Sequence, residues 1–108
     1  MSQTPIVDEN HLASFTGGDP KAEQELWDLY LLTADSYLES LRQASTEPEP
    51  WQRAAHSLKG ASANMGAQDM ARLAAEAERE VPNDERVAVL KGGLERLRRV
   101  IDERQQAS

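Results

Sequence analysis

The chain repeats apolar residues every three or four positions over most of its length, which is the spacing of amphipathic α-helices. The first long stretch follows Asp19 and Pro20, a capping carboxylate and a proline suited to the first position of a helix. This pattern predicts a helix from Pro20 to near Ala44. Its apolar positions are Leu26, Tyr30, Ala34, Tyr37, Leu38 and Leu41.

The same spacing recurs in three later segments and predicts helices over about 50–65, over 68–80 and from Asn83 onward. Gly66 is placed to end the first of these helices, because glycine readily adopts the left-handed conformation found at helix C-termini. Asn83 is placed to cap the last helix.

Prolines and glycines modify this pattern at two places. Pro48 and Pro50 are expected to interrupt helical structure between the first two long helices. Gly92 and Gly93 lie inside the last helix, where each costs about 1 kcal/mol relative to alanine. They predict either a kink or a close contact with another helix, and the sequence leaves both alternatives open.

The front of the chain is predicted to be less regular. Residues 8–15 are expected to form a short leading helix that stops at Thr16-Gly17-Gly18, and residues 1–7 a flexible tail. Residues 8–105 then form one domain. The predicted fold class is all-α: an antiparallel up-down-up-down four-helix bundle with a short leading N-terminal helix.

Composition and charge exclude several classes of function. The 108 residues include no cysteine, so neither disulfides nor thiolate metal sites are available. The net charge is -7, and residues 1–50 carry ten acidic against two basic side chains, which argues against binding nucleic acid or anionic membranes. With no signal-peptide pattern and no apolar run of about 20 residues, a cytoplasmic location is expected.

His56 is the residue whose surroundings point most clearly to chemistry. On the predicted helix it lies opposite the apolar stripe, beside Lys59, Gly60 and Ala63. Alanine would stabilise the helix more than Gly60 does, so the glycine is understandable if a large partner must approach the imidazole. We therefore expect an exposed nucleophile without internal partners. The apolar stripe consists of Trp51, Ala54, Leu58, Ala61 and Met65.

The segment from His56 to Ala67 reads HSLKGASANMGA. It resembles the pattern H-x-L-K-G-x-S-x-x-x-G-A of the histidine-containing phosphotransfer (HPt) domain of bacterial phosphorelays and matches it at every patterned position. The segment Met70–Glu76 and the start Gly17-Gly18-Asp19-Pro20 are also similar to family sequence. The resemblance covers nearly all of the chain beyond the tail.

The resemblance implies a phosphoryl carrier rather than an enzyme. His56 would accept a phosphoryl group on Nε2 from the aspartyl phosphate of a receiver domain and pass it to an aspartate of another receiver. Lys59 would offset negative charge on the phosphoryl group, and Gly60 and Ala63 would leave room for the receiver. The chain would hold no metal or cofactor of its own, because Mg²⁺ would come with the receiver.

The implied partners are receiver domains of response regulators, including those of hybrid histidine kinases, with the chain a monomer. The alternative is a helical-bundle adaptor without phosphate chemistry, whose binding to a signalling partner would not depend on His56. A di-metal bundle enzyme is disfavoured, because no glutamate lies three residues before either histidine.

Other residues carry weaker expectations. His11 follows Asp8 at helical ligand spacing, but two residues do not make a metal site, and His11 is interpreted as a surface or capping histidine. Leu29, Leu31 or Leu32 are candidates for exposed residues that dock a receiver. Counting along the antiparallel helices places His56 level with about 37–41 of one neighbour and 74–80 of the other.

Overall fold

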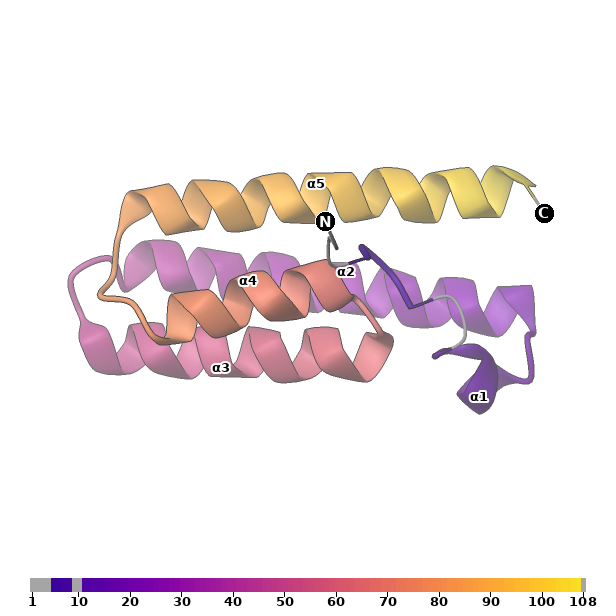
Figure 1. Ribbon diagram of the computed structural model, residues 1–108, viewed down its shortest axis with the longest axis horizontal. Helices are drawn as coiled ribbons and strands as arrows, with labels where there is room; N and C mark the ends of the chain where they lie inside the picture. The colour runs from indigo at the N-terminus through magenta and orange to yellow at the C-terminus, as the bar shows by residue number, and fades with distance from the viewer. Residues whose placement is uncertain (1–4, 9–10, 108) are drawn as a thin grey trace.

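The computed structural model describes residues 5–8 and 11–107, and these residues form an all-helical bundle (Figure 1). Four long helices run alternately up and down, preceded by one short helix, as the sequence predicts. None of the helices in the described part of the chain is long and apolar enough to cross a membrane. The helices are α1 (Ala13–Thr16), α2 (Pro20–Gln43), α3 (Pro48–Met65), α4 (Gln68–Glu78) and α5 (Asp84–Ala107).

The packing of the helices leaves one face of α3 open. α3 packs against α2 and α4, and α5 packs against the same two helices, so α3 and α5 lie at opposite corners of the bundle (Figure 1). α4 is less than half the length of α2 or α5. Because the two neighbours of α3 flank it, no helix among the described residues covers its outward face.

Three helix ends follow the predicted local signals. The Asp19 carboxylate accepts a hydrogen bond from the Lys21 backbone N–H at 3.1 Å, directly before Pro20. Gly66 ends α3 with a left-handed φ of 73°. The Asn83 side-chain oxygen accepts a hydrogen bond from the Arg86 N–H at 2.7 Å and caps α5.

Three predicted boundaries differ from the structure. α3 begins at Pro48 rather than near Pro50, because both prolines lie in its first turn, where the missing N–H has no intrahelical partner. α4 ends at Glu78, two residues earlier than predicted. The leading helix covers only Ala13–Thr16, and residues 9–10 of its predicted range lie outside the described residues.

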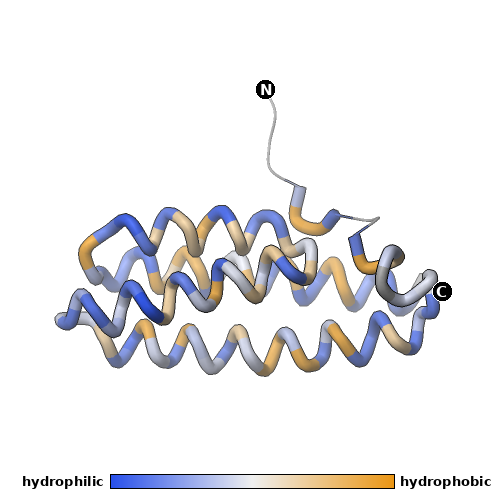
Figure 2. The backbone as a smooth tube through the Cα atoms, turned by 90° about the horizontal axis from the view of Figure 1, so that it is seen from below, coloured by the Kyte–Doolittle hydropathy of each residue, from blue (hydrophilic) through white to orange (hydrophobic). Residues whose placement is uncertain are grey.

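Most of the core is built from the predicted apolar stripes, which alternate with polar positions along each helix (Figure 2). The exception is Leu26 of α2, which is 36% exposed, whereas the adjacent Trp27 is buried. The polar groups of Trp51 and Tyr30 have hydrogen-bond partners inside the core, and the buried Asp69 carboxylate pairs with the partly exposed Arg72. The Trp51 indole N–H donates to the Ala77 carbonyl at 2.8 Å, and the Tyr30 hydroxyl lies 2.6 Å from the Ser62 hydroxyl. Burial raises the pKa of Tyr30 to about 12, so this hydroxyl stays neutral at ordinary pH.

The N-terminal segment packs on the bundle earlier than predicted. Val7 is only 7% exposed, and the Asp8 N–H donates to the Gly66 carbonyl at 2.8 Å. Residues 1–4 of the predicted tail lie outside the described residues. The packed part of the chain therefore begins before residue 8, ahead of the predicted domain boundary.

The glycine pair in α5 marks a close helix contact. α5 runs from Asp84 to Ala107 as one helix. A Cβ atom at Gly93 would lie 2.8 Å from Leu73 Cδ1 and 2.9 Å from Met70 Sδ, both on α4. Gly93 thus allows α4 and α5 to approach each other, and this decides between the two alternatives that the sequence leaves open.

Candidate functional site

His56 lies in the middle of α3, and its side chain is 67% exposed. The opposite side of the same helix is in the core, where Leu58 and Trp51 are fully buried. Rotation of α3 is therefore fixed by its apolar stripe, as the sequence predicts. The imidazole is held on the outward face of a rigid element.

The His56 ring is not free of internal partners, which corrects the expectation from sequence. Its Nδ1 lies 2.9 Å from Oε2 of Glu78, at the end of α4. An ionised carboxylate can only accept a hydrogen bond, so Nδ1 carries the donated proton. The lone pair of the neutral ring is then on Nε2, and no described residue forms a hydrogen bond with that atom.

Lys59 shares the same carboxylate. Its Nζ lies 2.7 Å from Oε1 of Glu78, so one carboxylate holds both the ring and the ammonium group. The hydrogen bond from Lys59, followed by that from His56, holds the pKa of Glu78 below its usual value, against an opposing effect of partial desolvation. Glu78 therefore remains an ionised acceptor at neutral pH. Lys59 was predicted to face a phosphoryl group, and in this state it contacts Glu78 instead.

Gly60 and Ala63 lie exposed on the same face of α3 as His56. A Cβ atom built on Gly60 would meet no atom within 4 Å. Nothing in the described part of the chain therefore requires glycine at this position. This agrees with the interpretation that Gly60 leaves space for an external partner.

A groove of about 460 Å³ opens beside His56, toward the start of α3. It combines the imidazole with charged and polar side chains from the two preceding turns of α3 and from the end of α4. The groove is lined by Glu49, Gln52, Arg53, His56, Ser57 and Glu78.

Among the described residues, no group of three or more histidine, aspartate and glutamate side chains could hold a metal ion.

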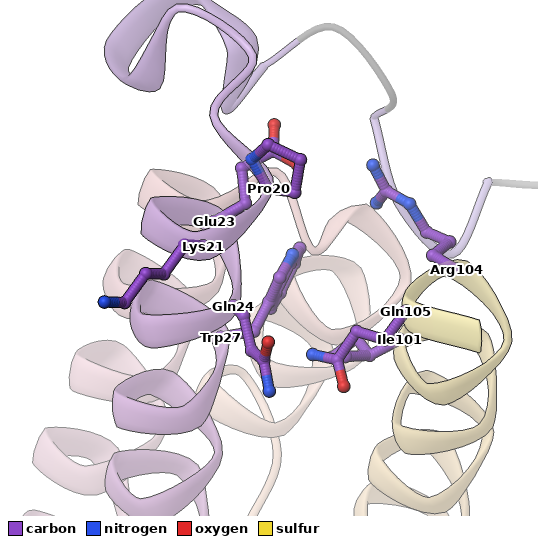
Figure 3. Close-up of a pocket in the computed structure, with 8 residues that line it drawn as sticks. All are labelled: Pro20, Lys21, Glu23, Gln24, Trp27, Ile101, Arg104 and Gln105. Atoms are coloured by element: carbon purple, nitrogen blue, oxygen red, sulfur yellow. The ribbon is translucent and has the colours of Figure 1, made fainter. Parts of the chain in front are cut away.

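A second pocket, of about 340 Å³, lies between the first turns of α2 and the last turns of α5 (Figure 3). The nearly buried Trp27 and Ile101 contribute apolar surface to it, and Lys21 and Arg104 contribute positive charge. None of its lining residues belongs to α3 or α4, so it is separate from the His56 site.

Exposed leucines on α2 add apolar surface to the outside of the bundle. Leu29 is 62% exposed and Leu32 is 71% exposed. Leu31, the third candidate from the sequence, packs partly against the core instead. Two of the three proposed docking leucines are therefore available to a partner.

Comparison with known proteins agrees with the all-helical fold. A search of curated proteins finds no match. The crystal structure of histidine-containing phosphotransfer protein B (HptB) from Pseudomonas aeruginosa PAO1 matches with a TM-score of 0.81 and 24% identity. The match covers 96% of this chain and 97% of that chain and shows that the fold is shared.

The family model of the Hpt domain matches residues 25–107, a range that contains His56, Lys59 and Glu78. Proteins of this family are phosphocarriers rather than enzymes in the usual sense, and they interact with receiver domains of response regulators or hybrid kinases. This chain belongs to the Hpt domain family and has its general role of phosphotransfer carrier.

Proposed function

We propose that this chain is a phosphorelay carrier whose His56 Nε2 accepts a phosphoryl group from a receiver aspartyl phosphate and passes it to another receiver aspartate. The observation that carries this proposal is the 2.9 Å contact between His56 Nδ1 and Glu78, together with the exposure of the ring. That contact fixes the proton on Nδ1 and leaves the outward nitrogen nucleophilic.

The transfer step follows from this geometry. The Nε2 lone pair attacks phosphorus, an N–P bond forms, and the P–O bond to the donor aspartate breaks as its carboxylate leaves with the electron pair. Because Nδ1 keeps its proton, the ring gains positive charge, which the Glu78 carboxylate stabilises from 2.9 Å. Transfer to the second receiver reverses the same bond changes.

Lys59 supplies mobile positive charge in this scheme. Its ammonium is on a flexible stem and is only partly buried, so it can turn from Glu78 toward phosphoryl oxygens as negative charge arrives beside it. Gly60 and Ala63 leave space for the receiver, which supplies the aspartate and the Mg²⁺. We place the carrier in the cytoplasm as a monomer, so that this face stays accessible.

The two histidines of the chain allow a matched test. His56→Gln and His11→Gln each remove one imidazole, and each variant is incubated with a phosphorylated receiver domain. We expect the wild type and His11→Gln to acquire acid-labile, alkali-stable phosphate, and His56→Gln to acquire none, because the His56 ring is exposed on α3 whereas His11 uses its Nε2 to contact the Asn64 carbonyl. Circular dichroism checks that both variants stay helical.

Equal labelling of His56→Gln and the wild type would contradict the assignment of the site. A wild type that binds receivers tightly but takes up no phosphate would instead support the adaptor alternative. Binding that is unaffected by His56→Gln is expected in either case, so binding alone does not decide between them.

A further inference from the structure

The surface differs on the two sides of His56 along α3. Toward the C-terminus, Gly60 and Ala63 leave an open surface. Toward the N-terminus, the groove of about 460 Å³ contains Arg53, Glu49 and other polar side chains. Any group attached to His56 therefore meets Lys59 and small side chains on one side and a charged groove on the other.

Arg53 is the cation in this groove, one turn before His56 on the same face of α3. Residues three apart on a helix have Cβ atoms about 5–6 Å from each other. Helical side chains also lean toward the N-terminus, so the His56 ring leans toward the turn that carries Arg53, and Lys59 leans back toward His56. A phosphoryl group on His56 would thus have one cation on each side.

The two cations are in different states. Lys59 is bound to Glu78 at 2.7 Å, which offsets its charge. The Arg53 guanidinium is exposed and forms no ion pair or side-chain hydrogen bond with any residue that the structure describes, including Glu49 on the preceding turn. Its charge is available without breaking an existing contact.

We propose that Arg53 is a second phosphate-binding residue of this site, which donates from its guanidinium to phosphoryl oxygens on His56 Nε2. This inference rests on the proposed function, because it needs a phosphoryl group at that atom. A planar guanidinium can donate two parallel hydrogen bonds to phosphoryl oxygens, which an ammonium cannot do. Arg53 would bind the group while Lys59 is still partly engaged by Glu78.

The test uses a small phosphoryl donor, so that the receiver plays no part in the measurement. Wild type, Arg53→Gln and Arg99→Gln are incubated with phosphoramidate, and the initial rate of phosphohistidine formation is measured. Arg99 is the matched control, since it is an exposed arginine on α5, which makes no contact with α3. We expect Arg53→Gln to react about three- to tenfold more slowly and Arg99→Gln to react like the wild type.

A second readout separates phosphate binding from a merely structural role. In ³¹P NMR, the phosphoryl group of Arg53→Gln should lose its last proton at higher pH than that of the wild type, because a nearby cation favours the dianion. Thermal unfolding should be unchanged, since the guanidinium has no internal partner among the described residues.

The outcomes are distinct. If the wild type is labelled and Arg53→Gln matches it in both rate and ³¹P titration, the role of Arg53 is overturned and the proposed function stands. If Arg53→Gln reacts more slowly only when a receiver is the donor, the proposal is also overturned. Such a result would mean that Arg53 contacts the receiver rather than the phosphoryl group. If the wild type takes phosphate from neither donor, the proposed function itself fails.

Discussion

A histidine and a glycine lie together at the outward, open face of α3, and another histidine and glycine lie together at its C-terminal end. The N-terminal segment packs against that second end, which we call the closed end. At the open face, His56 contacts Glu78 through Nδ1, and a Cβ atom at Gly60 would meet nothing within 4 Å. At the closed end, His11 contacts the Asn64 carbonyl through Nε2 at 2.8 Å. A Cβ atom at Gly66 would lie 2.8 Å from the Cβ of His11.

The difference shows how surroundings assign roles to identical side chains. His11 uses Nε2 to hold a carbonyl of the last turn of α3, which fits the second of the two roles, surface or capping, that the sequence left open for it. His56 uses its other nitrogen, its side chain is 67% exposed, and no described residue forms a hydrogen bond with its Nε2. Position 66 requires glycine because its backbone is left-handed and because His11 leaves no room for a Cβ atom. At position 60, no described residue creates such a requirement.

The largest expected effect comes from removing the carboxylate that orients His56. Glu78→Ala should slow phosphoryl transfer from a receiver roughly 10–100-fold, by analogy with the loss seen when the carboxylate that orients a metal-binding histidine is removed. Glu78→Gln should slow it less, because the amide oxygen can still accept from Nδ1 but carries no charge. Rapid-mixing transfer assays measure both variants.

Glu80 provides the matched control for Glu78. Its carboxylate pairs with Arg86 at 2.7 Å and connects the end of α4 to α5, away from the imidazole. Glu80→Gln should leave the transfer rate near that of the wild type. If Glu78→Ala transfers as fast as Glu80→Gln, the orienting role of Glu78 is wrong.

At the closed end, Gly66→Ala should destabilise the fold by about 2–3 kcal/mol, from left-handed strain plus the clash with His11. Gly17→Ala separates the two causes, because Gly17 has φ 66° but open space around a Cβ atom. Chemical denaturation should therefore show a smaller loss for Gly17→Ala. Equal losses would mean that His11 does not crowd this position.

At the open face, Gly60→Ala should have the opposite sign. It should stabilise α3 by about 0.5–1 kcal/mol, because alanine is the better helix former and its methyl group meets no neighbour. Transfer from a receiver should become severalfold slower, since the methyl group occupies space that the partner needs. A loss of stability, or unchanged transfer, would contradict the assignment of Gly60 to partner access.

The smallest effect concerns pH. The pKa of Glu80 is held below its usual value of 4.5, and the largest cause is its hydrogen bonding with Arg86. A carboxyl whose pKa is lower in the folded state stabilises the fold above its unfolded pKa, and this contribution disappears as pH falls below about 4.5. Melting temperatures measured from pH 7 to pH 3 should fall more steeply for the wild type than for Glu80→Gln. Parallel curves would show that the pair adds no stability.

Features encoded by neighbouring residues could be predicted from the sequence. Asp19-Pro20, Gly66 and Asn83 mark helix ends through contacts with residues a few positions away, and the structure has all of them. The face of α3 that carries His56 follows from its apolar stripe. Pro48 was misinterpreted, because a proline that breaks a helix interior is equally suited to its first turn.

Contacts between helices could not be predicted in the same way. Counting residues placed His56 level with 74–80, and Glu78 lies in that range, but several charged residues there were equivalent in sequence. Which of them faces α3 depends on the rotation of α4. The close approach at Gly93 likewise depends on Met70 and Leu73 of another helix.

Nitrogen NMR of the phosphorylated chain tests the central claim most directly. With ¹⁵N-labelled histidine, the nitrogen bonded to phosphorus can be identified in each of the two rings. We predict that phosphorus is bonded to Nε2 of His56, with Nδ1 still protonated toward Glu78. Phosphorus on Nδ1 of His56, or on either nitrogen of His11, would contradict the account.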